Sequence, residues 1–276
     1  MNIKEYLKKN RILGYLLFVL GNWYYNKVVC CVKELLACLR HWGFITNANC
    51  KALKDLKNIH VGKRCFIVAM GPSLTYSDLD KIQGEYSFSM NSIVKVLNEI
   101  SWKPTYYGIQ DHLVYEKLEA EILKISGIKV FIADVILKKG FKCSPNALIF
   151  PLSFYKHHYA YKKVKYSTRF SSDVSALVYD GYSITYSLLQ IAIYMGFKDI
   201  YLLGCDCNYS SNPTKQHFVE SGHFDPAYAS VGDKMIYAFQ QAKIYADKHN
   251  ISIYNATRGG KLEIFQRVDL DKVIFE

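Results

Sequence analysis

The sequence lacks several patterns that would place it in a well-marked class of proteins. None of its apolar runs reaches the ~18 residues that a membrane-spanning helix needs. Its eight cysteines include no Cys-x-x-Cys pair, and the chain contains no internal repeat, no Gly-x-Gly-x-x-Gly and no Walker loop. The 276 residues are 50% hydrophobic and 21% charged. We therefore expect one large or two small globular domains with free thiols, in a reducing cytoplasm.

Acidic residues are scarce in the first 65 residues, which carry twelve Lys and Arg against three Asp and Glu, whereas the rest of the chain is nearly neutral. Apolar stretches at 12–20 and 28–39, with Trp23 and two tyrosines between them, predict two amphipathic helices. We expect residues 1–45 to contact either the inner face of the cytoplasmic membrane or protein, meaning the main domain or a second copy of the chain. No nucleic-acid-binding motif accompanies the charge, so we expect no nucleic-acid partner.

Short apolar segments alternate with amphipathic segments along the rest of the chain. The apolar segments predict buried strands and the amphipathic segments predict helices. Such alternation produces a mostly parallel sheet with helices on both faces, so we expect an α/β, Rossmann-like fold after the N-terminal amphipathic helices. The expected strands are 65–69, 86–90, 105–109, 129–133, 147–152, 199–203 and 251–254, and the expected helices are 78–82, 92–100, 112–125, 182–195 and 233–249.

Composition and pattern divide the chain into two parts. We expect a basic helical segment over residues 1–58 and a nucleotide-binding α/β catalytic domain over residues 59–276. Residues 153–180 and 207–232 interrupt the alternation of strands and helices. Loops of this length within a compact domain are usually lids or substrate-binding elements, so we expect both to cover a ligand.

Polar residues follow the predicted strands, and in parallel sheets ligands bind beyond the carboxyl ends of the strands. The turn Gly71-Pro72-Ser73 leads into a helix, and the free amides of a helix start predict a phosphate site. Asn91 can read a base or a sugar, Asp111 can bind a hydroxyl or a metal, and Asp206 can orient a histidine or hold a ribose. Helix capping is the alternative for these residues, and the sequence leaves it open.

Two further groups of residues predict chemistry. Ser183 and Thr185 open a helix, where they bind phosphate or cap the helix. His217 and His223 lie in one loop that follows Tyr209. Histidine is the usual general base near neutral pH, so two histidines in one loop with tyrosines nearby predict a catalytic loop.

These motifs, in this order, resemble two related groups of proteins. The carriers of the resemblance are Gly71-Pro72-Ser73-Leu74, a strand ending in Asn91, the segment 196–206 that ends in Gly204-Cys205-Asp206, and a loop histidine. One group is the bacterial family 42 sialyltransferases, which use CMP-sialic acid. The other is the 6-hydroxymethylpterin diphosphokinase-like family, which includes motility accessory factors and proteins of polysaccharide gene clusters.

The resemblance implies a metal-independent glycosyltransferase of a modified GT-A fold that uses a nucleotide-activated sugar and no other cofactor. The sugar would be acidic and CMP-linked, and the acceptor a bacterial surface glycan or lipid-linked glycan. A loop histidine would be the general base, and His223 matches that position better than His217. Tyr209 would contact the leaving phosphate. Met70 stands where family 42 has a nucleotide-contacting Asn.

Two alternatives remain open from the sequence. A pterin diphosphokinase would need ATP and Mg²⁺, with Asp111 and Asp206 as the available metal ligands. A non-catalytic partner subunit of a glycan-assembly complex would need neither.

Overall fold

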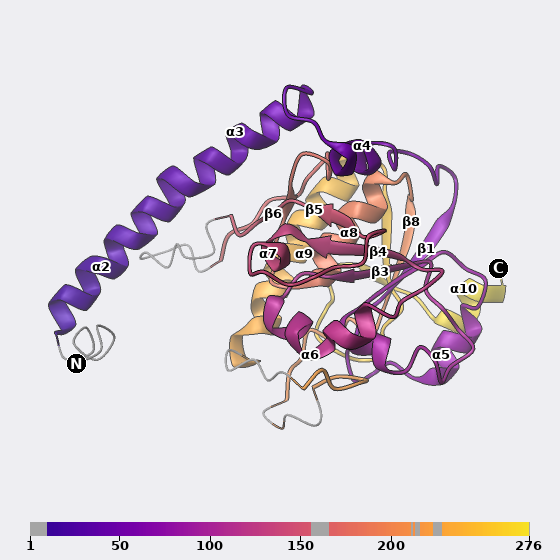
Figure 1. Ribbon diagram of the computed structural model, residues 1–276. Helices are drawn as coiled ribbons and strands as arrows, with labels where there is room; N and C mark the ends of the chain where they lie inside the picture. The colour runs from indigo at the N-terminus through magenta and orange to yellow at the C-terminus, as the bar shows by residue number, and fades with distance from the viewer. Residues whose placement is uncertain (1–9, 156–165, 211, 213–215, 223–227, 276) are drawn as a thin grey trace.

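The computed structural model describes residues 10–155, 166–210, 212, 216–222 and 228–275. Within these residues, eight parallel strands form one sheet in the order β10-β9-β8-β1-β2-β3-β4-β5 (Figure 1). The predicted α/β class with a parallel sheet is therefore confirmed. The strands are β1 (Arg64–Val68), β2 (Ser87–Met90), β3 (Tyr106–Ile109), β4 (Lys129–Ala133), β5 (Leu148–Phe150), β8 (Asp199–Leu203), β9 (Ser252–Asn255) and β10 (Gln266–Arg267).

The chain reverses its direction across the sheet at β1. From β1 it adds strands outward to β5, and it then returns to place β8 on the other side of β1. Val68 pairs with Ser89 of β2 and with Leu203 of β8, so these three strands end level with one another. Such a reversal opens a crevice at the carboxyl ends of the strands, which is where open α/β sheets bind ligands.

Helices cover both faces of the sheet. All residues of β2 and β3 are buried, as both faces of a parallel sheet require. Helix α8 is buried at ten of its eleven positions, which explains why its sequence is apolar nearly all round. The helices of the domain are α4 (Ala48–Lys54), α5 (Tyr76–Lys81), α6 (His112–Ile122), α7 (Asp134–Leu137), α8 (Ile184–Tyr194), α9 (Tyr228–Lys248) and α10 (Leu270–Phe275).

The predicted strands agree with the structure to within two residues at each end, but the predicted helix at 92–100 is wrong. The chain instead forms a single 3₁₀ turn, η2 (Asn91–Lys95), followed by irregular backbone. The side chain of Lys103 donates to the carbonyl oxygens of Leu97 and Ile100, which would otherwise continue the helical ladder. The short strand β10 and helix α10 were not expected from the sequence.

The N-terminal region forms one rod where two helices were expected. Helix α2 (Arg11–Tyr24) continues through a π-helical turn, η1 (Tyr25–Val29), into α3 (Cys30–His41). Asn26 donates to the carbonyl oxygen of Asn22 within this rod. The residues at both junctions keep helical dihedral angles, so the helix continues from α2 through η1 into α3. In Figure 1 the α2 end of the rod extends away from the sheet domain.

Helix α3 docks on a small second sheet. This sheet pairs β6 (Leu152–Ser153) with β7 (Val178–Tyr179). Lys33 donates to the carbonyl oxygen of Leu152 at 2.8 Å, and Glu34 accepts from the Tyr179 hydroxyl at 2.8 Å. Part of the expected insertion at 153–180 is therefore a docking surface for the rod. Among the described helices, none is long and apolar enough to cross a membrane.

Candidate functional site

A cleft opens at the carboxyl ends of β1, β2, β3 and β8, where the strand order reverses. It consists of two adjoining pockets with empty volumes, open solvent included, of about 440 Å³ and 780 Å³. Residues far apart in the sequence meet here. The predicted site residues that line the cleft are Gly71, Pro72, Asn91, Asp111, Ser183, Thr185, Asp206, Tyr209 and His217.

Ser73 does not line this cleft, and the phosphate site expected at its amide is already filled by a side chain of the protein. Oδ2 of Asp206 accepts from the Ser73 hydroxyl at 2.8 Å and from the Ser73 amide at 3.3 Å. Burial raises the pKa of Asp206, while the two hydrogen bonds from Ser73 act in the opposite direction. Asp206 therefore closes the turn after β1, because its carboxylate accepts the hydrogen bonds that these donors would otherwise offer to an anionic ligand.

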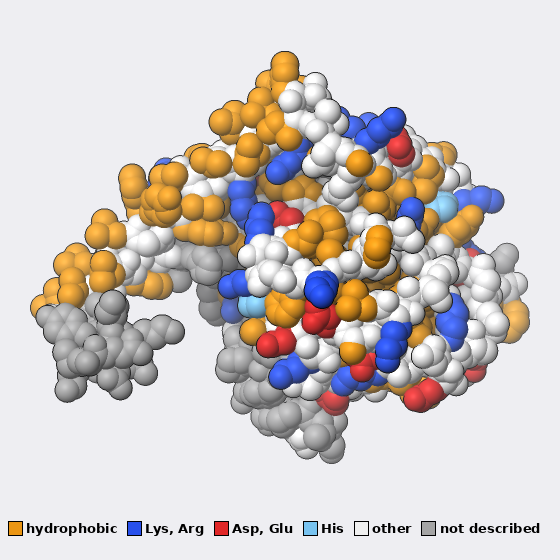
Figure 2. All heavy atoms as spheres, in the orientation of Figure 1, with side chains coloured by type: hydrophobic (Ala, Val, Ile, Leu, Met, Phe, Trp, Pro, Cys, Tyr) orange, Lys and Arg blue, Asp and Glu red, His pale blue; other side chains and the backbone are white. Residues whose placement is uncertain are grey.

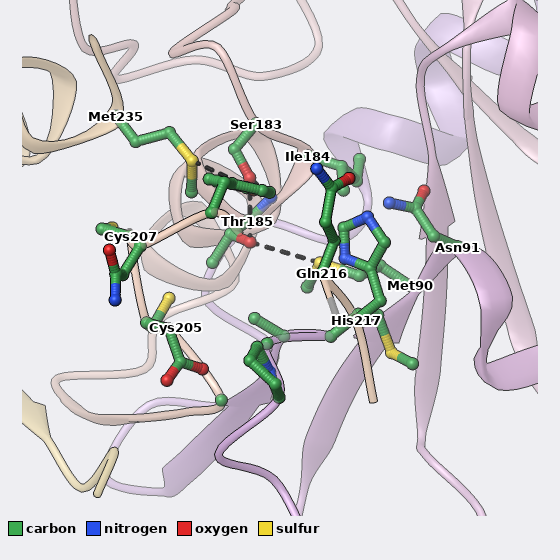
Figure 3. A pocket seen from close by; sticks show the side chains of 18 residues that line it. Met90, Asn91, Ser183, Ile184, Thr185, Cys205, Cys207, Gln216, His217 and Met235 are labelled. Atoms are coloured by element: carbon green, nitrogen blue, oxygen red, sulfur yellow. Dashed lines mark hydrogen bonds between the residues drawn. The ribbon is translucent and has the colours of Figure 1, made fainter. Parts of the chain in front are cut away.

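Helix α8 presents its amino end to the cleft. Tyr182 has a φ of 64°, a left-handed conformation that turns the chain into the helix. The Ser183 hydroxyl accepts from the Thr185 amide at 3.2 Å, and the Thr185 hydroxyl contacts Sδ of Met90 at 3.2 Å (Figure 3). Ser183 and Thr185 thus cap the helix and also line the cleft. An eleven-residue helix carries partial positive charge at this end, so the anion site suggested for Ser183 and Thr185 is well placed here.

Asn91 lies at the end of β2 and lines both pockets. Its φ of 48° is left-handed, a strained conformation that is common at functional sites. Oδ1 of Asn91 is buried and has no hydrogen-bond partner among the described residues. A buried acceptor of this kind costs about 1–3 kcal/mol unless a ligand or water satisfies it. Asn91 is therefore the residue of the cleft best placed to bind a donor group of a ligand.

His217 reaches the cleft from the loop at 216–222. The Phe218 amide donates to the carbonyl oxygen of Met70 at 2.7 Å, which ties this loop to the end of β1. Oε1 of Glu220 accepts from the His217 amide at 3.1 Å and holds the turn that carries the imidazole. Figure 3 shows His217 and Asn91 on one side of the cleft, with Cys205 on the other. The second predicted histidine, His223, lies outside the described residues.

Tyr209 and Asp111 both line the larger pocket of the cleft. The ring of Tyr209 is edge-on to His217 with centroids 6.0 Å apart, and its hydroxyl is 3.4 Å from Sδ of Met235. Oδ1 of Asp111 accepts from the Leu113 amide at 2.7 Å and caps α6. Asp111 is exposed, so its second oxygen faces the solvent side of the cleft.

A buried carboxylate beside the cleft escaped the sequence analysis. Asp180 is 4% exposed, and its Oδ1 accepts from Nε2 of Gln110 at 2.6 Å. Ser187 of α8 donates in turn to Oε1 of Gln110 at 2.6 Å. Burial raises the pKa of Asp180 to about 6. Asp180 stands in an irregular segment with no motif around it, so no local signal in the sequence could have identified it.

Asp180 also lines a further pocket that adjoins the cleft. This pocket shares Gln110, Asp111, Tyr182 and Val231 with the cleft and has an empty volume, open solvent included, of about 1060 Å³. Besides Asp180, its remaining lining includes apolar side chains and two lysines: His112, Leu113, Val135, Lys139, Phe154 and Lys234. A mixed apolar and charged surface next to the cleft can hold a second, larger substrate.

The charged side chains that line the cleft are acidic, because Asp206 lines one of its pockets and Asp111 the other. Of the described residues that line its two pockets, none is Lys or Arg. Within the described part of the chain, no group of three or more His, Cys, Asp or Glu side chains could hold a metal ion. The polar groups that line the cleft therefore include the amides at the start of α8, hydroxyls, the Asn91 amide, His217 and the carboxylates of Asp111 and Asp206.

Fold and site together define a Rossmann-like α/β protein with a candidate ligand cleft at its topological switch point. Within that class, the chain belongs to the MptE-like 6-hydroxymethylpterin diphosphokinase family, whose model matches residues 43–212. The predicted resemblance to this family is confirmed. No curated protein matches the sequence.

The solved structures that are similar to the chain include two glycosyltransferases. The MAf glycosyltransferase from Magnetospirillum magneticum AMB-1 is 15% identical, with a TM-score of 0.46, over 81% of this chain. The chain spans only 38% of the length of that protein. The sialyltransferase CstII from Campylobacter jejuni, solved with the substrate analogue CMP-3FNeuAc, is 15% identical, with a TM-score of 0.44, over 75% of this chain and 86% of its own.

Proposed function

We propose that the chain is a glycosyltransferase that moves an acidic sugar from a CMP-linked donor to a glycan acceptor of the bacterial surface. One observation carries this proposal: a cleft at the switch point combines the amino end of α8 with Oδ1 of Asn91, which has no hydrogen-bond partner among the described residues. The donor would carry one negative charge on its phosphate and one on its sugar carboxylate, and the amides at the start of α8 with the hydroxyls of Ser183 and Thr185 would bind the phosphate.

The catalytic step we propose uses a loop histidine as general base. The bond between the anomeric carbon and the phosphate oxygen breaks, and CMP leaves with the bonding electrons. The acceptor hydroxyl oxygen bonds to the anomeric carbon, and its proton passes to the imidazole of His217 or His223. The amides at the start of α8 and the hydroxyl of Tyr209, which line the cleft, would stabilise the negative charge on the leaving phosphate.

The acceptor would enter through the pocket that contains Asp180. This pocket adjoins the cleft along Gln110 and Asp111, and its aromatic side chains Phe154 and Tyr182 offer faces on which a sugar ring can stack. A carboxylate beside these rings can accept hydrogen bonds from sugar hydroxyls. The sugar donor in the cleft and the acceptor in this pocket would then meet at Asp111, which lines both.

The diphosphokinase alternative finds less support in the cleft. Its two candidate metal ligands have structural partners, because Ser73 binds Asp206 and the α6 amides bind one oxygen of Asp111. A triphosphate also carries several negative charges, and no Lys or Arg among the described lining residues would meet them. Membership of the family is compatible with either activity.

Thermal unfolding with a panel of nucleotides tests the proposal. CMP, CDP, UDP, GDP, ADP and ATP would each be added with Mg²⁺ and with EDTA. A ligand at 100 times its Kd adds about 2.7 kcal/mol to stability, so binding is easily detected. We expect CMP to stabilise the protein in EDTA. Stabilisation only by ATP or ADP with Mg²⁺ would favour the diphosphokinase, and no stabilisation by any nucleotide would favour a non-catalytic partner.

Substitution of each loop histidine separates the two candidate bases. We expect the variant that removes the base, His217→Ala or His223→Ala, to lose transfer activity by about 100-fold or more while CMP still stabilises the protein. His249→Ala, a substitution at the distant end of α9, is the control. Full activity in both loop variants would contradict a histidine base.

A further inference from the structure

Helix α2 exposes apolar side chains around most of its circumference. Ile12, Leu16, Leu17, Phe18 and Leu20 are between 46% and 75% exposed. At 100° per residue these five positions do not share one face. Figure 2 shows hydrophobic side chains along the rod as it leaves the domain. A helix that packs on a protein needs an apolar stripe on one side only, so this pattern indicates an apolar medium on several sides.

The charged and aromatic residues of the rod are arranged in order along it. No Asp or Glu occurs between Glu5 and Glu34, while Lys8, Lys9 and Arg11 precede the apolar stretch and Lys27 and Lys33 follow it. Trp23 and Tyr24 are 58% and 57% exposed at the end of α2 nearest these lysines. Tryptophan and tyrosine concentrate at the boundary between lipid headgroups and acyl chains, and lysines beyond them pair with anionic headgroups.

We propose that α2 is seated in one leaflet of an anionic lipid bilayer, with Trp23 at the headgroup level. Fourteen residues give a helix of about 21 Å, whereas one leaflet contributes only about half of the ~30 Å hydrocarbon core, so α2 would be tilted away from the bilayer normal to stay within that leaflet. A second copy of the chain would cover one side of α2 and leave the others in water. The lipid bilayer covers all of the exposed apolar side chains, and its charge complements the basic rod.

The seated rod would also set the position of the proposed acceptor pocket. The Tyr25 hydroxyl donates to the carbonyl oxygen of Phe154 at 3.3 Å, and Phe154 lines that pocket. Lys33 holds the adjacent residue Leu152. The pocket is therefore tied to the part of the rod that lies just beyond the headgroup level.

Vesicle binding followed by tryptophan fluorescence tests the proposal. The chain has three tryptophans, of which Trp23 and Trp42 are exposed and Trp102 is buried. The variant Trp42→Phe makes Trp23 the exposed reporter, and Trp23→Phe is its matched control. We expect vesicles of phosphatidylcholine and phosphatidylglycerol to shift the emission of Trp42→Phe to the blue, and brominated lipids to quench it. The control should show neither change, and equal responses of the two variants would overturn the placement of Trp23.

Substitutions in α2 test the apolar contribution. Leu16→Ser, Leu17→Ser and Phe18→Ser combined should lower the vesicle partition coefficient by at least about 100-fold. The control combines Val32→Ser and Leu35→Ser, which remove exposed apolar side chains from α3 and should leave partitioning unchanged. Nucleotide-induced stabilisation shows that each variant is folded. The proposal is wrong if the natural sequence does not bind anionic vesicles. It is also wrong if the natural sequence sediments as a dimer that the α2 substitutions dissociate, because a second copy then covers α2.

Discussion

At the scale of single residues, the turn at the edge of the cleft depends on Gly71, where the packed neighbours leave no room for a larger side chain. A Cβ on Gly71 would lie 1.9 Å from Oδ2 of Asp206 and 2.4 Å from the carbonyl oxygen of Gly204. Arg258 supports the same turn from outside, because it donates to the Ser73 carbonyl oxygen at 2.8 Å and pairs with Asp78. The Gly-Pro-Ser turn is thus fixed by tight packing and by charge.

Gly71→Ala should destabilise the protein by at least about 3 kcal/mol, because either Asp206 or the backbone of the turn must move. Gly21→Ala is the matched control, since a Cβ there meets nothing within 4 Å and the residue is helical. The control should be neutral or stabilising by about 1 kcal/mol. Urea denaturation measures both, and equal stabilities of the two variants would contradict the packing argument.

The buried carboxylate of Asp180 gives the protein a defined pH dependence. Its pKa is about 6 in the folded state and near 3.8 in the unfolded chain. Between these values the folded protein holds a proton that the unfolded chain has released, so its stability falls as pH rises through this window. Relative to Asp180→Asn, the natural protein should lose about 1.4 kcal/mol of stability between pH 5 and pH 7. Urea denaturation at both pH values checks this, and a constant difference would refute it.

At the scale of secondary structure elements, α8 organises both the cleft and the second sheet. Its amino end reaches the cleft, and Gln190 on the same helix is fully buried. Oε1 of Gln190 accepts from the amides of Ser171 and Tyr179, and its Nε2 donates to the Tyr179 carbonyl oxygen at 2.7 Å. One side chain thus satisfies backbone groups that strand pairing would satisfy in a regular sheet.

Gln190→Leu should destabilise the protein by about 3–5 kcal/mol, because it leaves several buried backbone groups without partners. The exposed Gln240→Leu in α9 is the control and should change stability by less than about 0.5 kcal/mol. Chemical denaturation measures the difference. A small effect at Gln190 would mean that water replaces these hydrogen bonds.

The loop that carries His217 is held by a few polar contacts. Glu220 binds the amides of Gln216 and His217, and Ser92 of η2 donates to the carbonyl oxygen of Val219. If His217 acts as the base, Glu220→Ala should lower kcat by about 10- to 100-fold, with nucleotide binding retained, because the imidazole loses its fixed position. Glu116→Ala, an exposed position on α6, is the control. An unchanged kcat would show that this loop does not position the reacting groups.

At the scale of the whole molecule, the rod and the sheet domain are joined by polar contacts of α3. Glu34 binds the Tyr179 hydroxyl, and Arg40 donates to the Ala176 carbonyl oxygen at 3.1 Å. His41 contacts Asp173 at 2.7 Å. These contacts fix the direction in which α2 leaves the domain (Figure 1).

Glu34→Ala combined with Arg40→Ala should loosen this junction without unfolding the sheet. We expect amide hydrogen exchange in α3 to accelerate by about tenfold or more, while the central strands keep their protection. Lys27→Ala, an exposed position on the rod, is the control. Acceleration in the central strands as well would show that the rod and the sheet unfold together.

The sequence by itself determined the class of fold. Short apolar strands that alternate with helices can be buried only in a parallel sheet with two covered faces, and the positions of seven of the strands followed from this pattern. It also identified most of the polar groups that line the cleft, because strand ends such as Asn91 and Asp206 must meet at one edge of such a sheet.

Only the tertiary structure decided which of these groups a ligand can reach. Ser73 and Asp206 looked equally available in the sequence, yet they bind each other, whereas Oδ1 of Asn91 has no partner among the described residues. Asp180 became a candidate only because folding buries it beside Gln110. Pairing and burial depend on residues distant in the chain, so no local pattern could reveal them.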